Sequence, residues 1–218
     1  MTSNPAPHTQ SGYLSKRALD VVGASLLTLI FSPVIVVVAG LIWKQTGRPV
    51  IYRQERVGRN GRPFQVLKFR TMVNNADEVL ACLLASDAEA SQEWLATRKL
   101  KNDPRITHVG GFLRKTSLDE LPQLFNVFKG DMSLVGPRPI DAEELSYYAQ
   151  FACGRYAEAY LSAKPGITGE WQVSGRSDIS YQERVQLDTD YISNPGVARD
   201  ISVLMRTVAV VLFGRGAY

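Results

Sequence analysis

Residues 111–130 read GFLRKTSLDELPQLFNVFKG, and this stretch decides the fold of the centre of the chain. Four of its apolar side chains recur at helical spacing, and the closing glycine is a common helix terminator. The four are Leu121, Leu124, Phe125 and Phe128. A short β-prone run at 132–135 and the turn sequence GPRP at 136–139 follow at once. The stretch therefore predicts a helix, then a strand, then a turn that two prolines make stiff.

The elements on either side of this centre are short and mostly helical. Two β-prone runs, 50–54 and 64–69, flank the pair Asn60-Gly61, which is a strong signal for a hairpin turn. Further helices are expected at 76–101, 142–162, 181–193 and 201–213, and a turn at 166–169 precedes an expected strand at 170–173. We therefore predict a helix-rich, compact α+β domain with a small β-hairpin and no large sheet.

The composition is that of a folded chain with one modest domain and an appendage. Hydrophobic residues make up 45% and charged residues 21% of the 218 positions. Cys82 and Cys153 lie far apart without a CxxC spacing, which indicates packed thiols in a reducing compartment. Two histidines, His8 and His108, exclude a His-rich metal site. Because no Walker A or GxGxxG loop is present, nucleotide phosphates would have to be held by side chains and a metal.

The appendage is an uncharged run, VVGASLLTLIFSPVIVVVAGLIW, at residues 21–43. Its length suits a transmembrane helix and exceeds that of a signal-peptide core. The polar residues before it include two prolines and are typical of a disordered tail. We therefore expect a disordered tail at 1–15, a membrane helix at 16–47 and a cytoplasmic catalytic domain with interfacial helices at 48–218.

The pair Ser32-Pro33 lies near the middle of the apolar run. A proline there kinks a helix, and the serine hydroxyl can satisfy a carbonyl that the proline frees. Basic residues flank both ends of the run, so the positive-inside rule places both ends in the cytoplasm. They are Lys16 and Arg17 before it, and Lys44, Arg48, Arg53, Arg56, Arg59 and Arg62 after it. We predict a re-entrant helix with arms of about 17 Å, and a straight span with a tolerated proline is the alternative.

The basic residues after the apolar run also indicate a partner. The chain has a formal net charge of +4, and this cluster suits anionic membrane lipids. No aromatic-basic interleaving or known nucleic-acid motif accompanies it, so nucleic acid is not expected as a partner. The last helix, at 201–213, is too short to span a membrane and is expected to lie at the interface.

Asp119-Glu120 is the pair with the clearest chemical potential. Two adjacent carboxylates at the start of a helix could serve as a nucleophile, a base or ligands of a metal. The alternative is a capping box from Ser117 to Glu120 with no chemical role. Pro122 weakens that alternative, because it would fall beyond the first turn, where proline fits a helix best.

Four basic side chains could hold phosphate near this pair. Arg138 lies between two prolines, which limit its backbone and suit a fixed guanidinium fork. Arg114 stands just before the acidic pair, and Lys68 and Arg70 belong to the run KFRT. In isolation each of the four could equally be a charge on a solvated surface.

These motifs together resemble a known family. The order of KRALDVVGA at 16–24, RVGRNGRPFQVLKFRTM at 56–72, LRKTSLDELPQLFNVFKGDMSLVGPRP at 113–139, KPGITGEWQVSGR at 164–176 and DTDYI at 188–192 is similar to that of the bacterial sugar transferase family, the monotopic polyprenyl-phosphate phosphoglycosyl transferases. The resemblance runs from about Lys16 to the C-terminus, and the block around SLDELPQLFNV and GPRP is highly specific. The chain resembles the short form of the family, which starts exopolysaccharide assembly.

The resemblance implies an activity and a role for each motif. A sugar-1-phosphate would pass from a UDP-sugar to undecaprenyl phosphate with release of UMP, through a covalent intermediate on Asp119. Glu120 would assist Asp119 and help to place Mg²⁺, which both carboxylates would bind. Arg138 would bind the nucleotide-sugar phosphates and Arg114 would stabilise phosphate charge. Ser32 and Pro33 would form the bend of a re-entrant helix in the bacterial inner membrane, with the catalytic domain on the cytoplasmic face.

Two other functions remain as alternatives from the sequence. A membrane-bound nucleotide-sugar pyrophosphatase would use the acidic pair only to bind metal and activate water. A non-enzymatic, membrane-tethered scaffold would use the basic face and the last helix, and it would tolerate loss of Asp119. Galactose or glucose is the sugar that the resemblance suggests, and the sequence sets neither the carrier length nor the oligomeric state.

Overall fold

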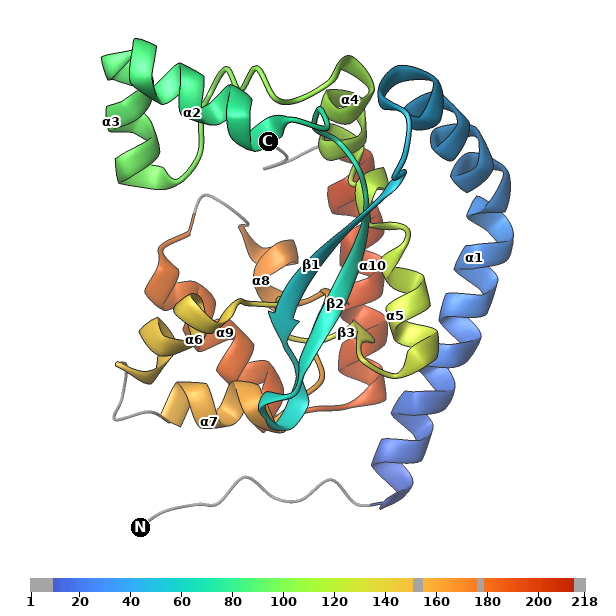
Figure 1. Ribbon diagram of the computed structural model, residues 1–218. Coiled ribbons are helices and arrows are strands. Elements are labelled where there is room, and N and C mark those ends of the chain that lie inside the picture. Colours follow the sequence, from blue (N-terminus) through green and yellow to red (C-terminus); the bar gives the residue numbers. More distant parts are fainter. Residues whose placement is uncertain (1–9, 151–154, 176–178, 214–218) are drawn as a thin grey trace.

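Figure 1 shows a globular body with one long helix along its outer edge. This computed structural model describes residues 10–150, 155–175 and 179–213. The body is built mostly of short helices, with a β-hairpin crossing its middle and a second pair of very short strands beside it. The helix-rich α+β class with a small hairpin is therefore confirmed.

The long helix, α1, spans Gln10–Thr46 and curves around the body (Figure 1). Its start corrects the boundary of the expected tail, because residues 10–15 are helical and residues 1–9 lie outside the described part. The helix continues through Pro33 and is not interrupted there. The Pro33 nitrogen carries no hydrogen, and the carbonyl of Leu29 that it would have satisfied accepts a bond from Ser32 Oγ at 2.9 Å. The role expected for the serine hydroxyl is thus confirmed.

The hairpin consists of β1, Ile51–Val57, and β2, Pro63–Phe69, which pair antiparallel. The expected turn residues, Asn60 and Gly61, have φ values of 60° and 74°. Both values lie in the left-handed region that Asn and Gly adopt most easily, so the Asn-Gly turn is confirmed.

The central stretch folds as two helices separated by a tight turn. Helix α4 spans His108–Thr116 and α5 spans Gln123–Lys129, with the 3-10 turn η2, Leu118–Glu120, between them. Ser117 ends α4 at φ 58°, a left-handed conformation that an N-cap does not have, and its side chain makes no capping bond to η2. The capping box is therefore absent. Gly130 ends α5 at φ 88°, as the sequence indicates.

A second, parallel pair of strands corrects one expectation. β3, Ser133–Val135, pairs with β4, Gly166–Thr168, where the sequence indicates a turn. The strand expected at 170–173 is wrong, because this segment forms the short helix α8, Glu170–Ser174. The two strands meet through glycine, since a Cβ on Gly166 would lie 2.1 Å from the backbone nitrogen of Gly136.

The remaining helices partly follow the sequence. The helix expected at 76–101 is divided into α2, Ala76–Ser86, and α3, Ala88–Thr97. The division occurs at Asp87, whose side chain accepts bonds from two backbone N–H groups of α3 and so caps it. The other helices are α6, Ala142–Ala149, α7, Arg155–Ser162, α9, Tyr181–Ser193, and α10, Val197–Phe213.

Both halves of α1 contribute to the core of the body. Its N-terminal half supplies Ala24 to the largest cluster, which lies between the hairpin, α5, α9 and α10. Its C-terminal half supplies Val38 and Ile42 to a second cluster with Phe69 and Leu113. A third cluster joins α6, α7 and α9. Its buried members are Ile140, Tyr148, Tyr160 and Val185.

Candidate active site

The acidic pair occupies η2, the tight turn between α4 and α5. Glu120 accepts a hydrogen bond from Lys68 Nζ at 2.8 Å, so the pair lies against strand β2. Both side chains of this ion pair are about a quarter exposed, at 26% and 27%. A partly open ion pair beside a carboxylate leaves room for a substrate to enter and exchange contacts.

Asp119 is the carboxylate of the acidic pair whose pKa is clearly shifted. Burial and the adjacent charge of Glu120 raise the pKa of Asp119 to about 6, while Lys68 and Arg114 act in the opposite direction. The sequence suggests that a helix start and Arg114 favour the ionised form, but burial and like-charge repulsion outweigh them here. A cation near the pair would lower this pKa again and increase the ionised fraction at neutral pH.

Arg114 lies in the last turn of α4, close to the acidic pair. Its Nε donates a hydrogen bond to Thr71 Oγ1 at 2.9 Å, which holds the guanidinium in place. Burial lowers the pKa of Arg114, and the charge of Asp119 counteracts this effect. Arg114 and Lys68 therefore lie close to the acidic pair Asp119-Glu120 (the dyad), as the sequence predicts for side chains that could hold phosphate there.

Arg138 follows β3 and is half-buried. Burial is the main cause that lowers its pKa, and the charge of Glu120 partly compensates. Its guanidinium carbon lies 5.5 Å from the ring centroid of Trp171. The guanidinium carbon of Arg184 lies 4.8 Å from the same centroid. Arg184 in turn pairs with Glu144 at 2.8 Å. Arg138 is therefore held by a packed aromatic and charged group and is not a solvated surface charge.

Sequence reasoning missed the group that surrounds Arg138. Trp171, Arg184 and Asp188 come from α8 and α9, and Asp188 is only 3% exposed. Burial raises the pKa of Asp188 to about 7, against the opposing charges of Arg184 and Arg138. The available signals were two motifs that carry the family resemblance, KPGITGEWQVSGR, which contains Trp171, and DTDYI, which contains Asp188.

Arg70 is the candidate that the structure does not bring to the dyad. Its Nη1 donates a hydrogen bond to the side chain of Asn74, and Asn74 Nδ2 donates to the carbonyl of Thr46 at 2.6 Å. This chain of bonds ties Arg70 to the C-terminal end of α1. Its observed contacts therefore link the hairpin to the long helix.

The donor set of the pair can be compared with the needs of a divalent cation. The described ranges contain no group of three or more His, Cys, Asp and Glu side chains that could hold a metal alone. Mg²⁺ commonly binds through one or two carboxylates, with substrate phosphates and water as its other ligands. Asp119 and Glu120 fit such a site, because two adjacent carboxylates repel each other until a cation neutralises them.

The outer side of α1 is strongly apolar. Within the described residues, α1 is the one helix that is long and apolar enough to cross a membrane by length and composition, over Gly12–Thr46, with a mean hydropathy of 2.5 in its most apolar 18 residues. Its most exposed apolar side chains lie on both sides of Pro33. They are Leu14 at 67%, Leu29 at 73%, Ile30 at 65%, Val36 at 70%, Val37 at 60% and Trp43 at 62% exposed. In water such a surface would be costly, so it requires an apolar partner.

A family model described as bacterial sugar transferase matches residues 11–214, and the chain belongs to this family. It is 46% identical over 207 residues to the exopolysaccharide production protein ExoY of Rhizobium meliloti, covering 95% of this chain and 89% of that protein. It is 52% identical over 211 residues to the undecaprenyl-phosphate galactose phosphotransferase of Salmonella typhimurium, covering 96% of this chain and 43% of that protein.

The UDP-galactose-lipid carrier transferase of Erwinia amylovora is 49% identical over 218 residues, which cover 100% of this chain and 44% of that protein. The chain therefore spans less than half the length of two of these relatives and most of the length of the ExoY protein. The family assignment predicted from the motifs is confirmed.

Proposed function

We propose that this protein transfers a sugar-1-phosphate from a UDP-sugar to undecaprenyl phosphate, releases UMP and so performs the first step of exopolysaccharide synthesis. The observation that carries the proposal is the environment of Asp119, a partly desolvated carboxylate beside Glu120 with Lys68 and Arg114 close by. The names of the relatives support the substrates, because two of them specify galactose transfer to a lipid carrier or undecaprenyl phosphate.

The proposed reaction has two displacements at one phosphorus atom. A carboxylate oxygen of Asp119 attacks the phosphorus that bears the sugar, and the bond from that phosphorus to the bridging oxygen breaks. UMP departs with the bridging oxygen and the bonding electron pair. An oxygen of undecaprenyl phosphate then attacks the same phosphorus, the Asp119–phosphorus bond breaks, and the carboxylate is restored. A covalent intermediate divides one difficult transfer into two easier ones.

The cationic side chains have distinct tasks in this reaction. Lys68 holds Glu120 and reduces the net negative charge that an incoming phosphate meets. Arg114 lies near Asp119 and can stabilise charge that develops on the phosphate oxygens. Arg138, positioned by Trp171, supplies a planar fork that suits bidentate phosphate binding. Mg²⁺ bound at the acidic pair would neutralise diphosphate charge.

The proposal places α1 in one membrane leaflet, with the body on the cytoplasmic face. Both halves of α1 contact the same body: Lys16 pairs with Asp200 at 2.8 Å, and Ile42 packs with Phe69 and Leu113. A straight span would carry one of these ends to the opposite side, away from its partners. The apolar outer side near Pro33 would then face the lipid, and the two ends would remain at the interface.

Intact-protein mass spectrometry tests the covalent step. Protein incubated with UDP-sugar alone, without lipid, should gain the mass of one sugar phosphate and release UMP. Asp119→Asn should show no adduct, while Glu120→Gln keeps the nucleophile and should retain a slow reaction. If no adduct forms under quench conditions that preserve acyl phosphates, and kinetics indicate a ternary complex, then direct attack by the lipid phosphate replaces this mechanism.

Cysteine labelling tests the membrane arrangement. Single cysteines near the N-terminus and at position 60 in the hairpin turn should react from the same side of sealed inverted vesicles. Labelling from opposite sides would refute the one-leaflet arrangement. Pro33→Ala restores a backbone donor at the bend and should favour a straighter helix.

A further inference from the structure

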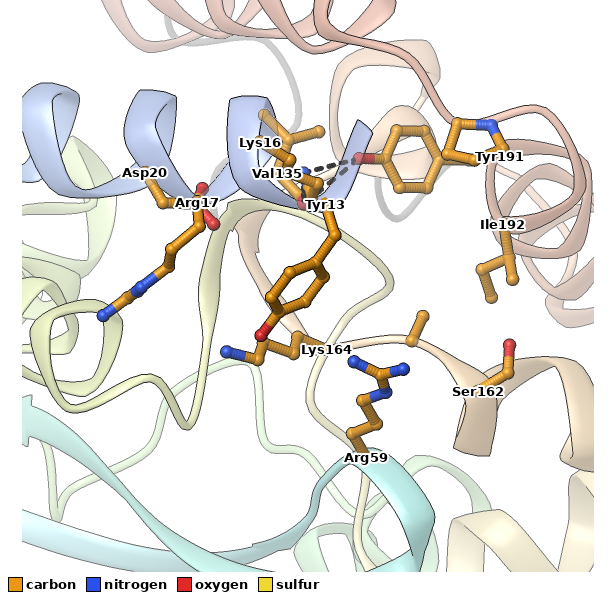
Figure 2. A pocket seen from close by; sticks show the side chains of 12 residues that line it. Tyr13, Lys16, Arg17, Asp20, Arg59, Val135, Ser162, Lys164, Tyr191 and Ile192 are labelled. Atoms are coloured by element: carbon orange, nitrogen blue, oxygen red, sulfur yellow. Dashed lines mark hydrogen bonds between the residues drawn. The ribbon is translucent and has the colours of Figure 1, made fainter. Parts of the chain in front are cut away.

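A small cavity lies at the base of α1, away from the acidic pair. It has a volume of about 60 Å³ and is formed by the first turns of α1, the hairpin turn and the segment before β4 (Figure 2). Since one water needs about 10–15 Å³ of such volume, the cavity has room for several water molecules, and hence for one compact oxyanion. Tyr13 points into the cavity between Lys164 and Arg59, and Arg17 lies beside it on α1.

The cavity collects four cations, and two of them are already bound. Lys16 donates to Asp200 at 2.8 Å, and Arg17 donates to the carbonyls of Val127 and Phe128 at 2.7 and 2.9 Å. The carboxylate of Asp20, the one acid of the cavity, accepts bonds from Ser133 and Leu134 and is thereby occupied. These three side chains fix the walls of the cavity.

The other two cations, Arg59 and Lys164, have no acidic partner among the ion pairs of the described residues. Each lies near the ring of Tyr13, at 5.8 Å for the Arg59 guanidinium and 5.9 Å for Lys164 Nζ. Residues 1–15 contain no Asp or Glu, so the adjoining segment supplies no carboxylate either. Positive charge at this end of the molecule is therefore not neutralised locally.

Two of the four cations, Lys164 and Arg17, lie close to each other beside Gly130. Lys164 Nζ and Arg17 Nη2 both approach Gly130, at 3.5 and 3.8 Å from where a Cβ would lie. Gly130 ends α5, whose carbonyl end attracts the two cations and holds them near each other. Like charges held together in a small cavity favour an anion with several oxygens, such as a phosphate group.

We infer that this cavity is a second anion site, which takes the phosphate of an anionic membrane lipid head group. Leu14, adjacent to Tyr13, is 67% exposed and begins the apolar outer side of α1, so the cavity opens beside the surface expected to meet lipid. The site is distinct from the acidic pair. Lys68 lies five residues along β2 from Pro63, about 17 Å at ~3.3 Å per residue, and Arg59 lies beyond that end of the strand in the hairpin turn. The inference does not depend on the chemistry proposed for Asp119.

Calorimetric titration of the full chain in a neutral detergent tests this site. The three probes are dihexanoyl phosphatidylglycerol, dihexanoyl phosphatidylcholine and inorganic phosphate. The anionic lipid should bind more tightly than the zwitterionic one, and Lys164→Gln should weaken it about tenfold through loss of one charge-assisted bond. Lys101→Gln removes the same charge from an exposed loop and should bind like the wild type. Arg138→Lys should leave this binding unchanged, which separates the cavity from the phosphate site near the dyad.

Hydrogen exchange locates the bound lipid. The anionic lipid should protect segments 12–17, 58–62 and 162–165, and Arg59→Gln should weaken binding independently of Lys164→Gln. Equally tight binding of inorganic phosphate, lost in the same variants, supports the anion site and assigns it to free phosphate. Equal affinities of Lys164→Gln, Arg59→Gln, Lys101→Gln and the wild type would overturn the inference, as would protection confined to the dyad region.

Discussion

Two acids of this molecule, Asp119 and Asp200, are surrounded in opposite ways. Asp200 is 1% exposed and accepts hydrogen bonds from Lys16 Nζ at 2.8 Å and from the Tyr191 hydroxyl at 2.5 Å. Asp119 lies beside another carboxylate, and its cationic neighbours do not prevent its pKa from rising to about 6. Asp200 joins α10 to α1 and α9 through these bonds, whereas Asp119 lies under like-charge repulsion from Glu120.

The difference predicts that Asp200 contributes to the stability of the fold and that Asp119 contributes to its reactivity. A carboxylate with its bonds complete gains nothing from a new partner, and its loss leaves a cation without one. A carboxylate under like-charge repulsion gains from any electrophile or cation that approaches it. Substitution of each acid should therefore affect a different measurement.

The largest effect is expected for Asp119→Asn. This change keeps the shape of the side chain and removes the nucleophile, so turnover should fall at least about a thousandfold. The unfolding transition at neutral pH should not move to lower denaturant. Steady-state UMP release and a denaturation curve in the same detergent measure the two properties, and appreciable turnover by this variant would place the nucleophile elsewhere.

Asp200→Asn should give the reverse result, a loss of stability of about 2–3 kcal/mol, because Lys16 loses its counter-charge in a partly buried site. Turnover per folded molecule should stay near that of the wild type. Asp131→Asn is the matched control: its ion pair with Lys129 is 3.5 Å long and exposed, so its stability should change by less than about 0.5 kcal/mol. Equal losses in both variants would contradict the distinction drawn here.

Arg138→Lys tests whether the guanidinium of Arg138 contributes to the reaction. The substitution keeps the charge but loses the fork and its stacking on Trp171, so kcat/KM should fall about tenfold or more. Arg70→Lys should have a much smaller effect, since Arg70 is bonded to Asn74 near the end of α1. If both variants lose activity equally, Arg70 reaches the substrate in a way that its observed contacts do not indicate.

The smallest effect concerns pH and follows from the raised pKa of Asp119. Adduct formation with UDP-sugar should increase with pH through about 6 and level off about one unit higher, because only the ionised carboxylate attacks. The stability contribution has the opposite sign: the folded state retains a proton that the unfolded chain loses between about pH 4 and 6. Asp119→Asn should therefore be more stable than the wild type by about 1–2 kcal/mol above pH 6, with no difference below about pH 4.

The local patterns of the sequence predicted the parts of the fold that depend on few residues. The hairpin with Asn60-Gly61, the end of α5 at Gly130 and the serine bond at Pro33 all follow from conformations or bonds that a short segment determines. Pro122 also weakened the capping-box alternative for the acidic pair, and the pair lies in the tight turn η2 without a capping bond from Ser117.

The failures have a common physical cause in contacts between distant segments. Segment 170–173 contains β-prone residues, yet the close approach of Gly166 to Gly136 places the strand before it. Trp171 and Arg184 reach Arg138 only because α8 and α9 pack against each other beside it. Arg70 appeared in the same run as Lys68 but bonds to Asn74, so neighbours in sequence serve different parts of the molecule.

The bonds between α1 and the body have a geometric consequence. Asp20 accepts hydrogen bonds from the Ser133 hydroxyl and the Leu134 backbone N–H at 2.8 and 2.9 Å, directly before the turn that carries Arg138. These bonds join α1 to the segment that carries Arg138, so in the one-leaflet arrangement proposed above Asp119 would lie at a fixed height above the bilayer. An acceptor phosphate that a spacer raises by a few ångströms should then be a poor substrate, because it would lie out of reach of the Asp119 carboxylate.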